Sequence, residues 1–316
     1  MPDRPRLRLG TRRSPLAMAQ AEEARASLMA AHPGLEVEIL PVTASGDRVQ
    51  GSLADAGGKA LWTKELDTWL LAGEIDLAVH SLKDVETLRP AEITIAAVLP
   101  REDVRDCLIG AKSLSDLPPG SRIGTSAPRR AALALRARPD CRVVGIRGNV
   151  ATRLAKLAAG EADATLLAKA GLNRLGMADT GVPLDPLDWL PAPGQGAIAI
   201  ECRTVLRQAQ DDRDSWIFGL LAAIDHAPSH HAVLAERALL AALGGNCHSP
   251  IAVLTEAEGD MLAMTAALLS PDGAEEVRGQ ARFALGDTAA PAALAADLLR
   301  RAGPAIRAHF DPPKGD

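Results

Sequence analysis

Short apolar segments alternate with longer segments in which apolar residues recur every three or four positions, over about the first two thirds of the chain. The short segments are typical of buried strands, and the longer ones are typical of amphipathic helices. Ser14-Pro15 is a helix start, since serine caps the orphan N–H groups and proline suits the first turn. Before residue 100 we expect strands at 6–10, 35–42, 75–82 and 93–99, and helices from Ser14 and over 61–72.

The same rhythm restarts near residue 105. The expected strands lie at 107–110, 121–125, 141–147 and 163–168, and the expected helices at 128–138, 149–159 and 169–175. Alternation of strands and helices predicts α/β lobes with mixed, mostly parallel sheets, whose ligand sites lie at the carboxyl ends of strands.

The segment 190–203 is a turn-rich connector followed by a strand without an immediate helix after it, so we interpret it as returning to the first lobe. The linkers near 100–104 and 191–197 would then form a two-stranded hinge that allows a cleft to close. From Asp225 onward, a helix at 228–243, alternating segments and an Ala/Leu helix at 288–309 indicate a small α+β domain. The predicted domains are 1–100 with 197–216, then 101–196, then 217–316.

Composition narrows the class of protein. A net charge of −5 and 2% aromatic residues leave neither a basic field nor stacking platforms, so nucleic acid is a poor partner. The N-terminus has no apolar signal core and no stretch reaches the roughly 18 apolar residues of a membrane span, so we expect a cytoplasmic protein without a membrane partner. The four cysteines show no CxxC spacing, so we expect neither a disulfide framework nor a metal site.

Arginine recurs at three predicted turns between a strand and a helix, at 10–18, 124–133 and 145–154. The first N–H groups of a helix lack internal partners and lie at the positive end of its dipole, so they bind anions. Arginine adds bidentate hydrogen bonds to carboxylates. Single arginines here could be solvated surface residues, but the repetition favours a site for a small polyanion.

The segment VHSLKDV at 79–85 places His80, Ser81, Lys83 and Asp84 at the end of a buried strand, where open α/β sheets bind ligands. Neighbouring cations would keep Asp84 ionised, so it suits stabilisation of a positively charged intermediate. The alternative is a loop ion pair between Lys83 and Asp84.

Cys247 follows a helix that ends at Gly244-Gly245, in an exposed loop next to His248. Such a thiol could be a nucleophile, a metal ligand or the attachment point of a covalent cofactor, and metal binding is the weakest of the three because no partner cysteines lie nearby. The glycine loop before Trp62 could be a lid with Trp62 laid on a flat ligand, or a helix N-terminus with Trp62 in the core.

Nine segments, taken in order, resemble the porphobilinogen deaminase family, also called hydroxymethylbilane synthases. The resemblance covers nearly the whole chain. The segments are GTRRSPLAMAQ, GGKALWTKEL, DLAVHSLKDV, REDVRD, GTSAPRR, IRGNVATRL, AGLNRLG, LPAPGQGAIAIECR and AERALLAALGGNCHSPI.

The resemblance implies two lobes like those of periplasmic receptors around a cleft, and a small C-terminal α+β domain. It implies a transferase of porphyrin and heme biosynthesis that joins four porphobilinogen molecules head to tail, releasing ammonia and, by a final hydrolysis, hydroxymethylbilane. The primer would be one dipyrromethane cofactor held by a thioether to Cys247, and Asp84 would be the catalytic residue. The long apolar helices have no obvious spare face, so we expect a monomer.

Further site residues are implied by motif match. Cofactor binding would involve Ser81, Lys83, Asp84, Thr125, Ser126, Arg129, Arg130, Arg147 and Gly148; substrate carboxylates would be bound by Arg12, Ser14, Arg153, Arg174 and Gln195; the lid would carry Lys59 and Trp62. The chain departs from the common family pattern at Asp55, Trp62, Glu86, Ala127 and Asn246.

Two rival functions predict different behaviour of Cys247. A non-enzymatic, two-lobed binding protein for a small carboxylate would bind reversibly and give Cys247 no special role. A cysteine-nucleophile transferase would form an adduct that disappears on turnover.

Overall fold

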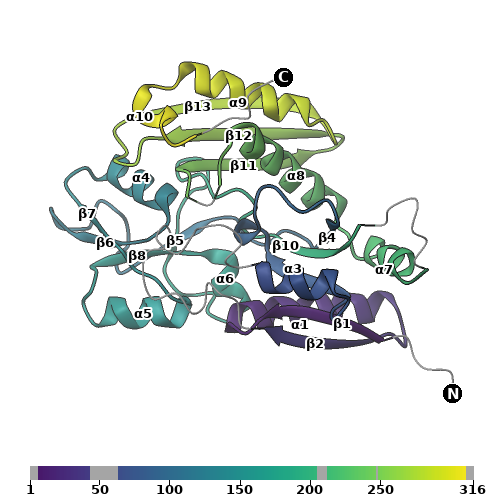
Figure 1. Ribbon diagram of the computed structural model, residues 1–316. Helices are drawn as coiled ribbons and strands as arrows, with labels where there is room; N and C mark the ends of the chain where they lie inside the picture. Colours follow the sequence, from purple (N-terminus) through teal and green to yellow (C-terminus); the bar gives the residue numbers. More distant parts are fainter. Residues whose placement is uncertain (1–5, 43–62, 205–211, 247, 311–316) are drawn as a thin grey trace. The chain divides into compact units, whose positions relative to one another are not determined.

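The computed structural model describes residues 6–42, 63–204, 212–246 and 248–310. The chain divides into two compact units (Figure 1), which are described separately. Unit 1 contains Met1–Arg101 and Ala197–His230, and unit 2 contains Glu102–Gly196 and His231–Asp316.

Unit 1 is built on a five-stranded sheet in the order β2-β1-β3-β10-β4. Strands β1 and β2 and strands β1 and β3 pair in parallel, whereas β10 is antiparallel to both of its neighbours. Among the described residues, four of the five strands therefore run in one direction. The strands are β1 (Arg6–Arg12), β2 (Glu36–Val42), β3 (Leu77–Ser81), β4 (Ile93–Val98) and β10 (Ile198–Arg203); the helices are α1 (Pro15–Ala31), α3 (Lys64–Leu71), the 3-10 helix η1 (Leu82–Asp84) and α7 (Asp212–Ala222).

Helix α1 begins where the sequence predicts. The Ser14 hydroxyl accepts a hydrogen bond from the backbone N–H of Ala17 at 3.3 Å, and Pro15 occupies the first turn. Its small and apolar residues pack with β1, β2, β3 and β10, and α7 closes the same core. Burial of this stripe, rather than helix propensity alone, fixes both helices against the sheet.

Unit 2 contains a second five-stranded sheet, in the order β7-β6-β8-β5-β9. Strand β6 is parallel to β7 and β8, and β5 is antiparallel to β8 and β9, so four of the five described strands again share a direction. The strands are β5 (Asp106–Ile109), β6 (Arg122–Gly124), β7 (Arg142–Val144), β8 (Ala164–Ala168) and β9 (Val182–Pro183); the helices are α4 (Pro128–Ala137), α5 (Val150–Ala158) and α6 (Lys169–Arg174).

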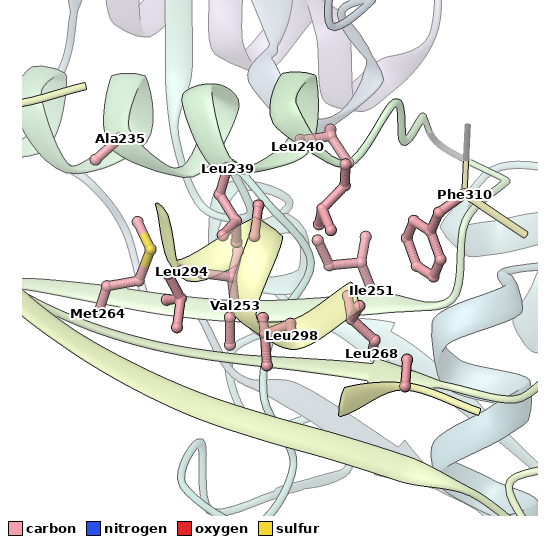
Figure 2. Packing of buried hydrophobic residues seen from close by; sticks show 14 of the residues in the cluster. Ala235, Leu239, Leu240, Ile251, Val253, Met264, Leu268, Leu294, Leu298 and Phe310 are labelled. Carbon is pink, nitrogen blue, oxygen red and sulfur yellow. The ribbon is translucent and has the colours of Figure 1, made fainter. Parts of the chain in front are cut away.

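The C-terminal part of unit 2 is a three-stranded antiparallel sheet in the order β11-β12-β13. One face of this sheet packs against helices, with Leu239, Val253 and Leu298 in the buried cluster (Figure 2). The other face, including Ala252 and Leu254, belongs to the core around α4, because side chains alternate along a strand. The elements are α8 (Ala227–Ala242), β11 (Ile251–Glu258), β12 (Met261–Leu269), β13 (Glu276–Ala284), α9 (Ala289–Arg301) and α10 (Pro304–Arg307).

Polar contacts also join the two parts of unit 2. The buried Glu236 of α8 accepts a hydrogen bond from the backbone N–H of Gly194 at 2.7 Å. The N–H of Val253 donates to the carbonyl of Pro191 at 2.9 Å. The C-terminal sheet and helix α8 therefore hold the segment that precedes the return to unit 1.

The expected α/β class, with two lobes of mixed, mostly parallel sheets and a small C-terminal α+β part, is confirmed. The expectation of one helix over 288–309 is wrong, because α9 ends at Arg301 and Gly303-Pro304 begins a separate turn, where proline cannot continue the helix. Helix α7 and strand β9 were not expected. The three-domain division stays a prediction. Within the described ranges, we find no helix with the length and apolarity needed to cross a membrane.

Candidate active site

The first part of the site is a pocket in unit 1, at the end of the sheet where β1 and β3 finish. Parallel strands bring their carboxyl ends to one edge, where the N-terminus of α1 also lies. The sequence-predicted residues Arg12, Ser14, Ser81 and Asp84 meet here. Leu16, Ala17, Gln20, Val79 and His80 complete the pocket.

Asp84 is half-buried at the end of η1, directly after β3. Leu82 and Val85 on either side are buried, and the N–H of Leu82 donates to the carbonyl of Ala197 at 3.1 Å. The turn that carries Asp84 is thus fixed by its apolar neighbours. Lys83 lies in the same turn.

Ser81 makes a polar contact inside the pocket, with Gln20, that the sequence did not predict. Its hydroxyl and the Gln20 side chain exchange hydrogen bonds of 2.8 and 2.9 Å. Gln20 is buried on α1, so this pair ties the end of β3 to the first turns of the helix.

A second set of predicted residues gathers in unit 2, at the carboxyl ends of β6 and β7. Ser126 is exposed and donates to the carbonyl of Ile146 at 3.1 Å, and Thr125 is buried. Asn149 caps α5 through Thr152, and the Nε of Arg153 donates to the carbonyl of Gly148 at 2.8 Å. Arg147 lies in the same turn as Gly148, whose φ of +113° favours glycine.

Arg129 and Arg130 are buried rather than exposed, and both bind one carboxylate, that of Asp106. Arg129 Nη2 donates to Oδ2 at 2.6 Å, and Arg130 Nη2 donates to Oδ1 at 2.7 Å. Trp189 Nε1 and Gln195 Nε2 also donate to this carboxylate, at 3.0 and 2.9 Å. Burial by itself raises the pKa of Asp106, but the two guanidinium groups outweigh it and hold this pKa well below its usual value.

This cluster, Asp106 with Arg129 and Arg130, carries more positive than negative charge. Both Nε atoms are buried and have no hydrogen-bond partner among the described residues. Buried donors without partners are costly, so a cluster of this kind suits an additional anion.

Arg174 and Gln195 lie near the points where the chain passes between the units. Arg174 Nη1 donates to the carbonyl of Gly196 at 3.1 Å, and Gln195 Nε2 donates to the carbonyl of Val104 at 2.7 Å. Asn173 contacts Glu102 at 3.2 Å. These contacts fix the backbone at both linkers of unit 2, a position that the sequence indicated only as a hinge.

Comparison with known proteins adds an independent observation. The family model described as "Porphobilinogen deaminase, dipyromethane cofactor binding domain" matches residues 7–211, and the model of the C-terminal domain of the same family matches residues 230–300. A porphobilinogen deaminase of Sphingopyxis alaskensis is 56% identical over 98% of this chain and 98% of its own length. One of Nitrobacter hamburgensis is 49% identical over 93% of each chain.

The chain belongs to the porphobilinogen deaminase family. The resemblance read from the sequence motifs is therefore confirmed. The region that matches the family's cofactor-binding domain contains both groups of residues described above, the pocket around Asp84 and the cluster around Asp106.

Two solved structures show a distant similarity to this chain. A putative periplasmic sulfonate-binding protein from Methylobacillus flagellatus is 17% identical, with a TM-score of 0.40 over 71% of this chain and 69% of its own. DctP7, a Bordetella pertussis solute receptor that binds pyroglutamic acid, is 11% identical, with a TM-score of 0.41 over 70% and 78%. These scores are too low to support an argument.

Three of the four cysteines lie among the described residues. Cys107, Cys141 and Cys202 are buried, and burial raises their pKa values, that of Cys202 to about 12. Cys247, and with it the lid residues Lys59 and Trp62 and the departure at Asp55, lie outside the described residues.

Sequence reasoning missed three charged residues that organise these sites, namely Asp106, Arg89 and Glu201. Asp106 and Glu201 each stand in a strand of apolar residues, where an acidic side chain is rare unless it is paired. The sequence could therefore have indicated that Asp106 and Glu201 are paired, but not which residues are their partners. Among the described residues, no group of histidine, cysteine, aspartate and glutamate side chains could hold a metal ion.

Proposed function

We propose that the chain is a porphobilinogen deaminase that condenses four molecules of porphobilinogen to hydroxymethylbilane, with loss of four molecules of ammonia and addition of one water. The observation that carries this proposal is the pocket of unit 1, which places the Asp84 carboxylate beside Arg12 and the N-terminus of α1. Membership of the family supports the same activity.

Asp84 has the chemistry that the condensation needs. Loss of ammonia from porphobilinogen leaves positive charge shared with the ring nitrogen, and a carboxylate that accepts the pyrrole N–H stabilises that charge. The half-buried position of Asp84 keeps it in a region of reduced dielectric, where such an interaction is stronger than in water. Asp84 therefore acts by electrostatic stabilisation of the developing positive charge.

The acetate and propionate of porphobilinogen require cations or N–H donors. In unit 1 the candidates are Arg12, Ser14 and the first turn of α1, and in unit 2 the candidate is Arg153 of α5. Ser126 and Arg147, before the starts of α4 and α5, remain assigned to the cofactor by motif match. Helix N-termini and guanidinium groups together bind carboxylates well. Arg174 and Gln195 would act with them from the linkers.

The residues of unit 2 fit an anionic dipyrromethane. The excess positive charge of the Asp106 cluster suits carboxylate groups, as do its two Nε donors, which have no hydrogen-bond partner among the described residues. Motif match adds Thr125 and Gly148 in unit 2 and, separately, Ser81 and Lys83 in unit 1 as cofactor-binding candidates. When bound, the dipyrromethane supplies the nucleophilic carbon to which the first porphobilinogen is joined. The family resemblance implies that Cys247 would hold it by a thioether. The other three cysteines are buried and have raised pKa values, so they are poor nucleophiles, which is consistent with this assignment.

The test is the intact mass of the purified protein, with peptide mapping of Cys247, before and after addition of porphobilinogen. We expect a permanent increment of two pyrrole rings on Cys247 and further steps of one ring with substrate. An adduct that disappears on turnover would favour a cysteine-nucleophile transferase. An unmodified mass, even after addition of preassembled dipyrromethane, would favour a carboxylate-binding protein.

The proposal includes a monomer in the cytoplasm. Light scattering coupled to size-exclusion chromatography should give a mass near the 33.0 kDa of one chain. A concentration-independent mass of twice that value would contradict it.

A further inference from the structure

Glu201 is a charged residue in the interior of the unit 1 sheet. It lies on β10 between β3 and β4, opposite Ala78, and its side chain has no exposed surface. The register of β10 against β4 shifts between Ile200 and Glu201, and such a bulge redirects a side chain. A buried glutamate in a sheet persists only when other groups satisfy both of its oxygens.

Arg89 satisfies both oxygens of Glu201. Its Nε donates to Oε1 and its Nη2 donates to Oε2, each at 2.9 Å, which is a bidentate pair. The Nε2 of His80 lies 3.2 Å from Oε2 of the same glutamate. His80 and Asp84 both line the pocket. The Glu201–Arg89 pair therefore contacts one residue of the pocket lining, His80, through Glu201.

Arg89 also contacts helix α3 and a second acidic residue of its own loop. Its Nη1 donates to Oδ2 of Asp67, on α3, at 3.1 Å, and the same nitrogen lies 3.4 Å from Glu86. Arg89 follows Asp84 by five residues, and its side chain is only 8% exposed. The loop after Asp84 is thus fastened to β10 and to α3 through one guanidinium group.

Strand β3, which carries His80 near its end, has a second buried carboxylate just before its start. Asp76, directly before β3, is buried and binds Arg8 of β1 at 3.0 Å and Arg213 of α7 at 2.9 Å. This second network resembles the first in chemistry, with a buried carboxylate held by arginine. Asp76, Arg8 and Arg213 are not among the residues that line the pocket.

We infer that Glu201 and Arg89 are positioning residues for the reaction at Asp84. They hold His80, which lines the pocket, and the loop after Asp84 in fixed positions. The inference rests on the proposed function. Buried ion pairs add little stability compared with apolar packing, because desolvation of the charges offsets their attraction. Their value here is geometric, because a displacement of about 1 Å at a reacting group can cost roughly 10²-fold in rate.

The experiment measures kcat, KM and Tm of the cofactor-loaded protein for the wild type, E201Q, R89K and the control D76N, with porphobilinogen as substrate. We expect E201Q to lower kcat by roughly 10- to 100-fold with KM changed by less than about 3-fold. R89K should lower kcat in the same direction, because lysine lacks the bidentate fork. D76N should lose comparable Tm while its kcat stays within about 2-fold of wild type.

Two results would overturn the inference. One is an E201Q variant whose kcat is within 2-fold of wild type; the other is a D76N variant that loses as much kcat as E201Q at an equal loss of Tm. If E201Q does not fold, R89K is judged against D76N by the same criteria. A loaded wild type that is inactive would overturn the proposed function as well, whereas an active wild type with fully active variants overturns this inference alone.

Discussion

The two five-stranded sheets share an arrangement but differ in the charges that they bury. In each sheet, four strands run in one direction and one strand, β10 or β5, is antiparallel to them. Strand β5 is the first strand after the chain passes into unit 2 at Glu102, and β10 is the first strand after it returns to unit 1 at Ala197. Each of these antiparallel strands carries one fully buried carboxylate, Glu201 or Asp106. The similarity of topology makes the difference in chemistry informative.

Asp106 is the first residue of β5, opposite Ala168 at the carboxyl end of β8, and binds two arginines. Glu201 lies deeper, opposite Ala78, and shares its one arginine with Asp67. Unit 2 thus has an excess of positive charge near the edge of its sheet, whereas the Glu201 network of unit 1 holds more carboxylates than guanidinium groups. The two sheets share a topology but bury different charges, and this difference fits the two roles that we propose, anion binding in unit 2 and stabilisation of a positive charge at Asp84 in unit 1.

Removal of the Asp106 charge should have the largest effect. In D106N two buried guanidinium groups lose their shared carboxylate, and breaking a buried pair in this way costs about 3–5 kcal/mol of unfolding free energy. Urea unfolding at neutral pH measures the change. The matched control is D140N, because Asp140 is exposed although its partner Arg138 is half-buried, and this change should leave the unfolding midpoint nearly unchanged. A D106N protein as stable as D140N would contradict the claim that Asp106 compensates the two buried arginines of unit 2.

The second prediction concerns Asp84, in the pocket of unit 1. D84N should leave binding of porphobilinogen largely intact and lower kcat by about 10²–10³-fold, the range found when one group that stabilises developing charge is removed. Steady-state kinetics and direct binding of substrate give the two quantities separately. Rates like those of the wild type in D84N would exclude the role assigned to Asp84.

Stability at low pH should report the Glu201 pair. Burial alone would raise the pKa of Glu201, but His80 and Arg89 lower it to about 2 from an ordinary value of 4.5. A lowered folded-state pKa contributes stability above pH 4.5 that is lost as pH falls toward 2, on the order of 3 kcal/mol in total. The difference in unfolding free energy between wild type and E201Q should be constant above about pH 5 and shrink below it. A difference that does not vary with pH would show that the charge of Glu201 adds no stability.

The smallest expected effect concerns the start of α4. Ser14 and Asn149 cap α1 and α5 with side-chain hydrogen bonds, whereas Ala127 at the N-cap of α4 has none, although its backbone is extended as a cap requires. A127S should therefore add about 0.5–1 kcal/mol of unfolding free energy. Urea unfolding of A127S beside wild type measures it, and A127G, expected to differ from wild type by less, is the control. A lower midpoint in A127S would mean that the hydroxyl does not cap the helix.

The sequence by itself determined the periodic elements and the chemistry at their ends. Ser14-Pro15 and Asn149 mark helix starts through local hydrogen bonds, and the segment at 79–85 places Asp84 after a buried strand because strands of that pattern end at the ligand edge of a sheet. These features depend on residues a few positions apart. The family motifs added roles that local patterns do not encode.

Only the tertiary structure decided which charges meet. Arg129 and Asp106 are 23 positions apart, and Arg89 and Glu201 are 112 apart. Such partners are set by strand order, which depends on how whole elements pack together and leaves no periodic trace in the chain. For that reason the arginines of α4 looked like surface ligands in the sequence and are buried partners of Asp106 in the fold, where desolvation favours charges that are paired.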